Sequence, residues 1–183
     1  MLKLMPSSQM NIESATDFYN SYTPGDRPLA GYELAVYGEE KYLEYVSSDY
    51  TKHYYLVDSD NEDYILGYCT LNDDNCRDWN DVGNISYDVR PTERRKRYGS
   101  AMLELLLDVC CEEGRKWVCV SSEKGNVASQ KIIESHGGIF EKEFYDDFEG
   151  AGLKYWIKVR PKVPNRAKRL VKLFKKEMER YKY

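Results

Sequence analysis

The fold is indicated by one stretch of the sequence, Ile85-Ser86-Tyr87-Asp88-Val89-Arg90-Pro91-Thr92-Glu93-Arg94-Arg95-Lys96-Arg97-Tyr98-Gly99-Ser100-Ala101. Its β-forming start predicts a strand over 84–90, and its apolar end predicts a helix from about Gly99 to Glu113. The turn between them begins at a proline and contains four consecutive cations, Arg94, Arg95, Lys96 and Arg97. Such a strand-to-helix turn presents unpaired backbone N–H groups and a positive helix end to an anion. The added cations predict a phosphate or pyrophosphate site.

Composition favours one globular domain with a short appendage. The chain has 183 residues, of which 42% are hydrophobic, enough for a buried core. No apolar run approaches the ~20 residues of a membrane-spanning helix, and residues 1–11 lack the apolar segment of a secretory signal. The five cysteines are an odd number and include the adjacent Cys110 and Cys111, which favours reduced thiols in a cytoplasm. Without a CxxC motif, and with His53 and His136 far apart in sequence, we expect no metal site.

Charge divides the chain near Pro161 and Pro164. Residues 160–183 carry ten Lys or Arg and two Glu, so the other 159 residues must be strongly acidic to give the net charge of −4. Apolar residues in this tail follow helical spacing: Ala167, Leu170, Val171, Phe174, Met178 and Tyr181. We therefore expect a basic amphipathic helix over 161–183 that docks on the acidic domain or on a second copy of the chain, as in a homodimer. Contact with nucleic acid or an anionic membrane surface is the alternative that we favour less.

The remaining segments alternate between helices and strands. Helices are expected at 13–22, 39–47 and 126–136, and strands at 54–57, 65–71, 116–121, 139–148 and 155–159. The acidic segment 58–63 joins one hairpin, and Gly150 and Gly152 mark the turn of a second. This order predicts an α/β fold with a mixed, mostly antiparallel sheet, a central parallel pair and flanking helices, plus the C-terminal helix.

Two segments together resemble the GNAT superfamily of N-acetyltransferases. The run Tyr87–Gly99 is similar to the family's acetyl-CoA-binding motif, an Arg or Gln followed by x-x-Gly-x-Gly/Ala at a strand-to-helix turn. The segment Asn126–Gly138 resembles the next motif, an Asn-x-x-Ala/Ser helix that ends at a glycine. The segment Lys154–Ile157 resembles the last strand of a bacterial subgroup. Since the match extends over residues 12–160 in the right order, it implies a GNAT-like domain over residues 1–160.

The resemblance implies that acetyl-CoA is the co-substrate. Its pyrophosphate would lie on backbone N–H groups between Arg95 and Ser100. The strand with Tyr87 and Val89 would diverge from strand 116–121, leaving backbone groups for the pantetheine, and an N–H near Val89 would polarise the thioester carbonyl. The residues implied to contact the cofactor are Tyr87, Val89, Arg94, Arg95, Lys96, Arg97, Tyr98, Gly99, Ser100, Asn126 and Ser129.

The sequence departs from the family pattern at two places. Arg95 and Arg97 stand where the loop usually has glycine, and Arg97 either points outward, adds a phosphate contact or fills the site. Ile133 occupies the position of the tyrosine that protonates the leaving thiolate in many members. The catalytic residues therefore stay unassigned, with Tyr155 as a weak candidate beside Tyr145 and a bound water.

Several residues also have plain structural interpretations. Asn126 alone would be a helix N-cap, and His136 is better explained as a helix-end cap than as a base. Cys119 is expected to be a small core residue. An acidic loop of Asp73, Asp74, Asp78 and Asp81 could attract a cationic amine, although a solvated loop explains it better.

The sequence thus predicts a cytoplasmic N-acetyltransferase. An amine from a small molecule or a protein would attack acetyl-CoA directly in a ternary complex. The alternative is a catalytically weak GNAT-fold module that binds acyl-CoA or a partner, as Arg97, Ile133 and the basic tail would allow. Tyrosine-rich segments at 32–55 and 144–156 predict an acceptor pocket lined by aromatic rings.

Overall fold

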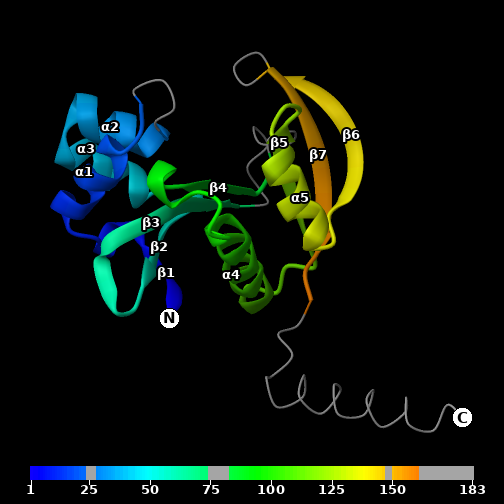
Figure 1. Ribbon diagram of the computed structural model, residues 1–183, viewed down its shortest axis with the longest axis horizontal. Coiled ribbons are helices and arrows are strands. Elements are labelled where there is room, and N and C mark those ends of the chain that lie inside the picture. The colour runs from blue at the N-terminus through cyan, green and yellow to red at the C-terminus, as the bar shows by residue number, and fades with distance from the viewer. Residues whose placement is uncertain (24–27, 74–82, 147–149, 161–183) are drawn as a thin grey trace, which may run out of the picture.

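The computed structural model describes residues 1–23, 28–73, 83–146 and 150–160. They form one seven-stranded sheet in the order β1-β2-β3-β4-β5-β7-β6 (Figure 1). Its strands are β1 (Leu2–Pro6), β2 (Thr51–Asp58), β3 (Asn61–Asn72), β4 (Ile85–Val89), β5 (Trp117–Glu123), β6 (Ile139–Asp146) and β7 (Gly150–Lys158). Its helices are α1 (Ile12–Asn20), α2 (Leu29–Tyr37), α3 (Glu39–Val46), α4 (Tyr98–Glu112) and α5 (Val127–Ser135), with short 3-10 turns η1 (Ser7–Gln9) and η4 (Pro91–Glu93).

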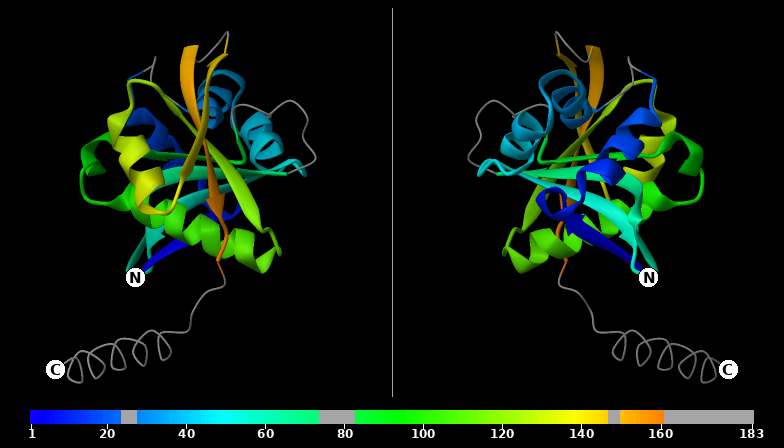
Figure 2. Two further views of the ribbon diagram at one scale, coloured as in Figure 1. Left: turned by 90° about the vertical axis from the view of Figure 1, so that its right-hand side faces the viewer. Right: turned by 90° about the vertical axis from the view of Figure 1, so that its left-hand side faces the viewer.

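The two halves of the sheet diverge at its centre. Strands β1 to β4 are joined by antiparallel pairing, and so are β5, β7 and β6. The halves meet through the parallel pair β4–β5, whose register within the described residues has the single partner pair Ile85 and Val120. Figure 2 shows the result, since β6 and β7 run steeply across the direction of β2, β3 and β4.

Each face of the sheet has its own hydrophobic core. Helices α4 and α5 cover one face, where Met102, Leu103 and Leu106 are fully buried against strand residues. Helices α1, α2 and α3 cover the other face around an aromatic cluster that includes Phe18, Tyr19 and Tyr55. Because side chains alternate between the faces of a strand, Ile85, Tyr87 and Val89 of β4 are directed to the core beside α4, whereas Ser86 and Asp88 are directed to the other face.

The predicted fold class is confirmed, with three differences in its elements. Strand β1 and helix α2 lie in segments where the sequence predicted neither, and β1 adds an edge strand beside β2. Strand β7 begins at Gly150 rather than near Tyr155, so the glycines predicted to form a turn lie inside the strand. The helix of the opening motif has nearly the expected bounds, and Gly114 follows it with a left-handed φ of 77°.

Some predictions fall on segments outside the described residues. These are the turn at Pro24–Asp26, Cys76, Asp74, Asp78 and Asp81 of the acidic loop, and the basic tail 161–183. In the part of the chain that the structure describes, no helix is both long enough and apolar enough to cross a membrane.

Candidate functional site

The loop between β4 and α4 has an unusual backbone at two arginines. Arg95 has a φ of 66° and Arg97 a φ of 69°, and these are the only non-glycine residues with positive φ among those described. This left-handed conformation costs an L-residue roughly 1–2 kcal/mol and is typical of glycine. The chain thus keeps the backbone that the GNAT resemblance associates with glycine, although both positions are arginine.

This backbone leaves a row of donors unpaired. Among the described residues, none accepts a hydrogen bond from the backbone N–H groups between Arg95 and Ser100. The first N–H groups of a helix have no partner within it, so those of Tyr98, Gly99 and Ser100 add to the donors of the loop. The helix dipole gives this end of α4 a partial positive charge, which makes the loop suitable for a phosphate group.

The four cations of the loop differ in their partners. Arg94 donates from Nε to the Val89 carbonyl at 3.3 Å, and its Nη2 lies 3.4 Å from Oδ1 of Asp88. Lys96 forms an ion pair with Glu93 at 2.8 Å. Arg95 and Arg97 are exposed and form no ion pair with any described residue. The two guanidinium groups available to an anion therefore belong to the residues with the left-handed backbone.

The gap between β4 and β5 adjoins this loop. The Arg90 N–H donates to the Leu66 carbonyl at 3.0 Å, so the backbone groups of every second residue of β4 face β3. By the same alternation, the backbone groups of Tyr87 and Val89 face the side of β5. Because the strands diverge beyond Ile85, these groups border a gap of the kind predicted for the pantetheine.

One wall of this gap is closely packed. A Cβ atom added to Gly99 would lie 3.1 Å from Cδ1 of Ile132 and 3.6 Å from side-chain atoms of Tyr87 and Val89. The hydroxyl groups of Tyr87 and Ser129 lie 2.9 Å apart in a hydrogen bond. The structure therefore brings together Tyr87, Val89, Gly99 and Ser129 from both motifs of the resemblance.

The second motif also contains capping residues. Asn126 is the N-cap of α5, and its Oδ1 accepts a hydrogen bond from the Ser129 N–H at 3.1 Å. His136 ends this helix with Nδ1 2.8 Å from the Ile132 carbonyl oxygen. The capping interpretations of both residues are thus confirmed, and Asn126 retains its amide nitrogen for a further contact.

Two polar residues that the sequence analysis did not select lie beside the gap. Asp88 precedes Val89 on β4, and its side chain is 37% exposed. Burial raises the pKa of this carboxyl, while Arg94, the Val89 N–H and Tyr22 act in the opposite direction. The Tyr22 hydroxyl is buried and forms no well-aligned hydrogen bond to a described residue, although it interacts with the Asp88 carboxylate. Burial raises the pKa of Tyr22, and the charge of Asp88 raises it further, so the two groups are close.

Arg90 anchors helix α1 to the end of β4. Its buried guanidinium lies between two aromatic rings, 4.4 Å from the centroid of Tyr64 and 5.4 Å from that of Phe18. It donates to the Ile65 carbonyl at 2.6 Å and to Asp17 at 2.9 Å. This contact fixes α1, and hence the turn that contains Tyr22, against the strand with Asp88.

A tyrosine-rich cluster continues from Asp88 across the same face. Tyr68 is the register partner of Asp88 on β3, and its hydroxyl lies 2.5 Å from Nδ1 of His53. The Tyr55 hydroxyl forms hydrogen bonds with those of Tyr42 at 2.7 Å and Tyr19 at 2.9 Å. Burial lowers the pKa of His53 to about 4. These side chains are therefore uncharged near neutral pH, so the cluster supplies packing and hydrogen bonds rather than a proton-accepting base.

Tyr155, the weak candidate for a catalytic residue, belongs to the core beside α4 rather than to the face of the sheet with Asp88. Tyr155 is buried in the core beside the ring of Phe140, and its pKa is raised by burial and by Glu134. Ile133 is fully buried in the same core. Cys69, Cys110, Cys111 and Cys119 form no disulfide within the part of the chain that the structure describes, and Cys119 is buried as expected.

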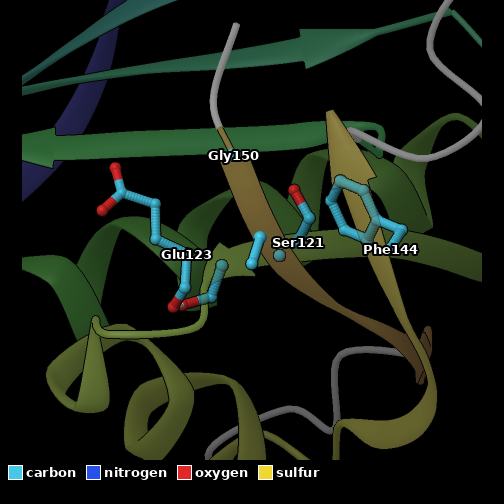
Figure 3. Close-up of a pocket in the computed structure, with 7 residues that line it drawn as sticks. Ser121, Glu123, Phe144 and Gly150 are labelled. Carbon is cyan, nitrogen blue, oxygen red and sulfur yellow. Dashed lines mark hydrogen bonds between the residues drawn. The ribbon is translucent and has the colours of Figure 1, made fainter. Parts of the chain in front are cut away.

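Two hollows lie apart from Asp88. The first is lined by Ser121–Glu123 of β5, Gly150–Gly152 of β7 and Phe144 of β6, and Figure 3 shows the Glu123 carboxylate extending away from Phe144. Its volume of about 10 Å³ holds at most one water molecule. The second, of about 370 Å³, lies near the C-terminal ends of α4 and α5, with Asp108, His136 and Arg160 in its lining. The described residues hold no group of three or more His, Cys, Asp or Glu placed for a metal ion.

The diverging sheet and the donor-rich loop define an acyltransferase fold, and comparison with known proteins identifies the family. Residues 10–139 match the acetyltransferase (GNAT) domain family, to which the chain therefore belongs. A search of curated protein sequences found no match.

Solved structures show the same fold. The spermidine/spermine N-acetyltransferase of Vibrio cholerae is similar with a TM-score of 0.62 and 13% identity, covering 86% of this chain and 95% of that one. The ribosomal-protein-S18-alanine N-acetyltransferase of Escherichia coli gives 0.57 and 13%, covering 90% and 98%. A ribosomal L7/L12 alpha-N-protein acetyltransferase in complex with coenzyme A gives 0.62 and 12%, covering 86% and 94%.

Proposed function

We propose that this protein is a cytoplasmic N-acetyltransferase that transfers an acetyl group from acetyl-CoA to a primary amine in a ternary complex. The observation that carries the proposal is the row of unpaired N–H groups between Arg95 and Ser100, beside a gap bordered by the backbone of Tyr87 and Val89. Bound acetyl-CoA would supply an acetyl group activated as a thioester. The residues present fit such a ligand, because the loop offers N–H donors and the guanidinium groups of Arg95 and Arg97, which form no ion pair with any described residue.

Each residue set has a separate task in this proposal. The N–H groups of the loop, with Arg95 and Arg97, would hold the pyrophosphate, and Asn126 and Ser129 would border the other side of the gap. The backbone N–H of Val89 would donate to the thioester carbonyl and stabilise the negative charge that develops there. The acceptor would approach from the face covered by α1, α2 and α3, since Asp88 and Tyr22 lie there.

The acceptor is a small-molecule amine or the amino group of a protein. The similar solved proteins are named for acetylation of spermidine or of ribosomal proteins, so both classes belong in a first screen. An acyl-CoA-binding module without turnover is the second candidate, because Ile133 replaces the usual proton donor and is fully buried.

Titration with acetyl-CoA tests the proposal directly. The purified protein is expected to show a rise in thermal midpoint and a calorimetric binding signal. Incubation with spermidine, other polyamines, amino acids, aminoglycosides and peptides with an N-terminal alanine should then release free thiol and add one acetyl group to an amine. Binding without release of thiol would favour the binding module, whereas absence of both would reject the proposal.

A further inference from the structure

We propose that Asp88 accepts a proton from the acceptor ammonium, with the Tyr22 hydroxyl as its second contact, and that Arg94 covers Asp88 until a bound pyrophosphate attracts the guanidinium away. This inference rests on the proposed function, since it assigns the acceptor end of the same site. It also couples the two substrates through one side chain.

The position of Asp88 supports the assignment. Its side chain is on the face of the sheet opposite α4, because its register partner Tyr68 belongs to the core under α1, α2 and α3. Its backbone directly precedes Val89, whose N–H interacts with the Asp88 carboxylate in the free protein and is the predicted donor to the thioester carbonyl once acetyl-CoA is bound. A carboxylate one residue from that donor can reach an amine bound next to the acetyl group.

Tyr22 supplies an independent indication of a ligand. Tyr22 is only 5% exposed, and its hydroxyl interacts with the Asp88 carboxylate without forming a well-aligned hydrogen bond to any described residue. Such a buried group costs about 1–3 kcal/mol, which a bound amine could recover by donating to the phenolic oxygen. The nearby carboxylate would hold the positive charge of the same amine.

Arg94 links this pocket to the phosphate loop. Arg94 belongs to the loop, but its guanidinium extends back to Asp88 and to the Val89 carbonyl. Pyrophosphate carries more negative charge than one carboxylate and accepts two parallel hydrogen bonds from a guanidinium. A pyrophosphate on the loop would therefore compete with Asp88 for Arg94.

The charged neighbours of Asp88 determine its protonation. Arg94 and the Val89 N–H favour the carboxylate form, Tyr22 acts in the same direction, and burial opposes them. Arg90 lies near Tyr22, and its charge lowers the pKa of that hydroxyl. Removal of Arg94 leaves burial less opposed, so the pKa of Asp88 rises further and the carboxylate becomes a stronger base.

The protons balance in this sequence. The ammonium gives one proton to Asp88 and becomes a neutral amine with a free electron pair. The nitrogen then forms the C–N bond while the C–S bond of the thioester breaks and the sulfur leaves with the electron pair. The nitrogen loses a second proton, which neutralises the thiolate, and Asp88 releases its own proton to water.

Calorimetry with acetyl-CoA tests this coupling without knowledge of the acceptor. Measurements in buffers of different ionisation enthalpy, over about pH 4.5 to 6.5, give the number of protons taken up on binding. We expect the wild type to take up more protons than Asp88→Asn, and this difference reports on Asp88 because the phosphates of the ligand contribute equally to both proteins. We also expect Asp88→Asn to bind acetyl-CoA about two- to fivefold more tightly. In this variant Arg94 can contact the pyrophosphate without first breaking a half-exposed ion pair with Asp88. Asp60→Asn, an exposed carboxylate in the β2–β3 turn, is the matched control and should equal the wild type.

Turnover provides the second readout once an amine from the screen is acetylated. Asp88→Asn should lower kcat by about 100-fold or more near neutral pH and remove the acidic limb of the pH profile. If all variants bind acetyl-CoA with the same affinity, proton uptake and kcat, the inference is wrong and the proposed function stands. If no variant binds acetyl-CoA, the proposed function itself fails.

Discussion

Replacement of Arg97 separates the two consequences of placing an arginine in a left-handed backbone. Its φ of 69° costs roughly 1–2 kcal/mol in an L-residue, and glycine avoids that cost but loses about 0.5–1 kcal/mol of unfolded-state entropy. Arg97→Gly should therefore raise the free energy of unfolding by up to about 1 kcal/mol. Arg97→Ala keeps the strained backbone, so it should remain near the wild type.

Affinity for acetyl-CoA should change in the opposite direction. Both variants lose an exposed guanidinium that has no described ion-pair partner, so both should bind about three- to tenfold more weakly. The loss should shrink at high salt, since exposed charges are screened. Lys96→Ala is the comparison within the same loop, and it should lose less because Glu93 already pairs with Lys96.

Urea unfolding and isothermal titration calorimetry measure both effects. Equal stability of Arg97→Gly and Arg97→Ala would refute the strain argument. Tighter binding by both variants would refute the phosphate contact and show instead that the arginine side chain fills the site. Unchanged binding by both variants would mean that the Arg97 side chain points outward, so the glycine and alanine variants together decide among the three interpretations that the sequence left open.

Three further changes test the structure around the site. Burial lowers the pKa of His53 to about 4, below its ordinary 6.5, so the unfolded chain protonates first and this residue should reduce stability by about 3 kcal/mol as pH drops from about 6.5 to 4. Urea unfolding should therefore show a steeper loss of stability over this range for the wild type than for His53→Gln, in which the carboxyl groups still titrate. Gly67→Ala should destabilise by about 1–3 kcal/mol, since its Cβ would lie 2.8 Å from the Asp88 carbonyl oxygen and from Sδ of Met102, and a wild-type thermal midpoint would contradict this packing. Arg90→Met should cost about 2–4 kcal/mol in chemical denaturation because a buried hydrogen-bonded cation is lost, and a loss under 0.5 kcal/mol, which is about the size of an ordinary surface substitution, would contradict the anchoring role.

The sequence predicted the central part of the fold because its signals there are local. The segment from β4 to α4 combines β-forming residues, a proline, a cationic turn and an apolar helix, and each of these has a pattern of its own. Helix α2 was missed because the segment Leu29–Tyr37 is apolar on most faces and has no 3.6-residue period. Strand β1 has only five residues, and its pairing with β2 depends on a segment about fifty residues away in sequence.

Glycines caused the error in the last hairpin. Gly150 and Gly152 were expected to form the turn, yet both belong to β7. A Cβ at Gly152 would lie 2.4 Å from Cζ of Phe144, so this glycine makes room for an aromatic ring on the neighbouring strand. A turn glycine and a packing glycine look the same in a single sequence, because only the neighbouring strand distinguishes them.

The candidate site was predictable in its backbone but less so in its side chains. The anion-binding role of the loop followed from the order of strand, turn and helix. The direction of Arg94 did not, because both Glu93 and Asp88 lie within reach of its guanidinium along the chain, and only the fold shows that it pairs with Asp88 while Glu93 pairs with Lys96. Tyr22 gave no signal, since it comes near Asp88 only through the packing of α1 that Arg90 stabilises.

The two candidate functions make different demands on Tyr22. A module that only binds acyl-CoA needs the loop and the gap, and it gains nothing from a buried hydroxyl that forms no well-aligned hydrogen bond to a described residue. An acetyltransferase uses that hydroxyl when the amine arrives, so the cost in the free protein is recovered in the ternary complex. Tyr22→Phe should therefore raise the free energy of unfolding by up to about 1 kcal/mol, leave the affinity for acetyl-CoA unchanged and raise the KM for the amine. Denaturation, calorimetry and steady-state kinetics measure these three quantities. A variant that is less stable than the wild type by more than about 1 kcal/mol would mean that the hydroxyl already has a partner in the free protein, and the argument for an amine at this position would fail.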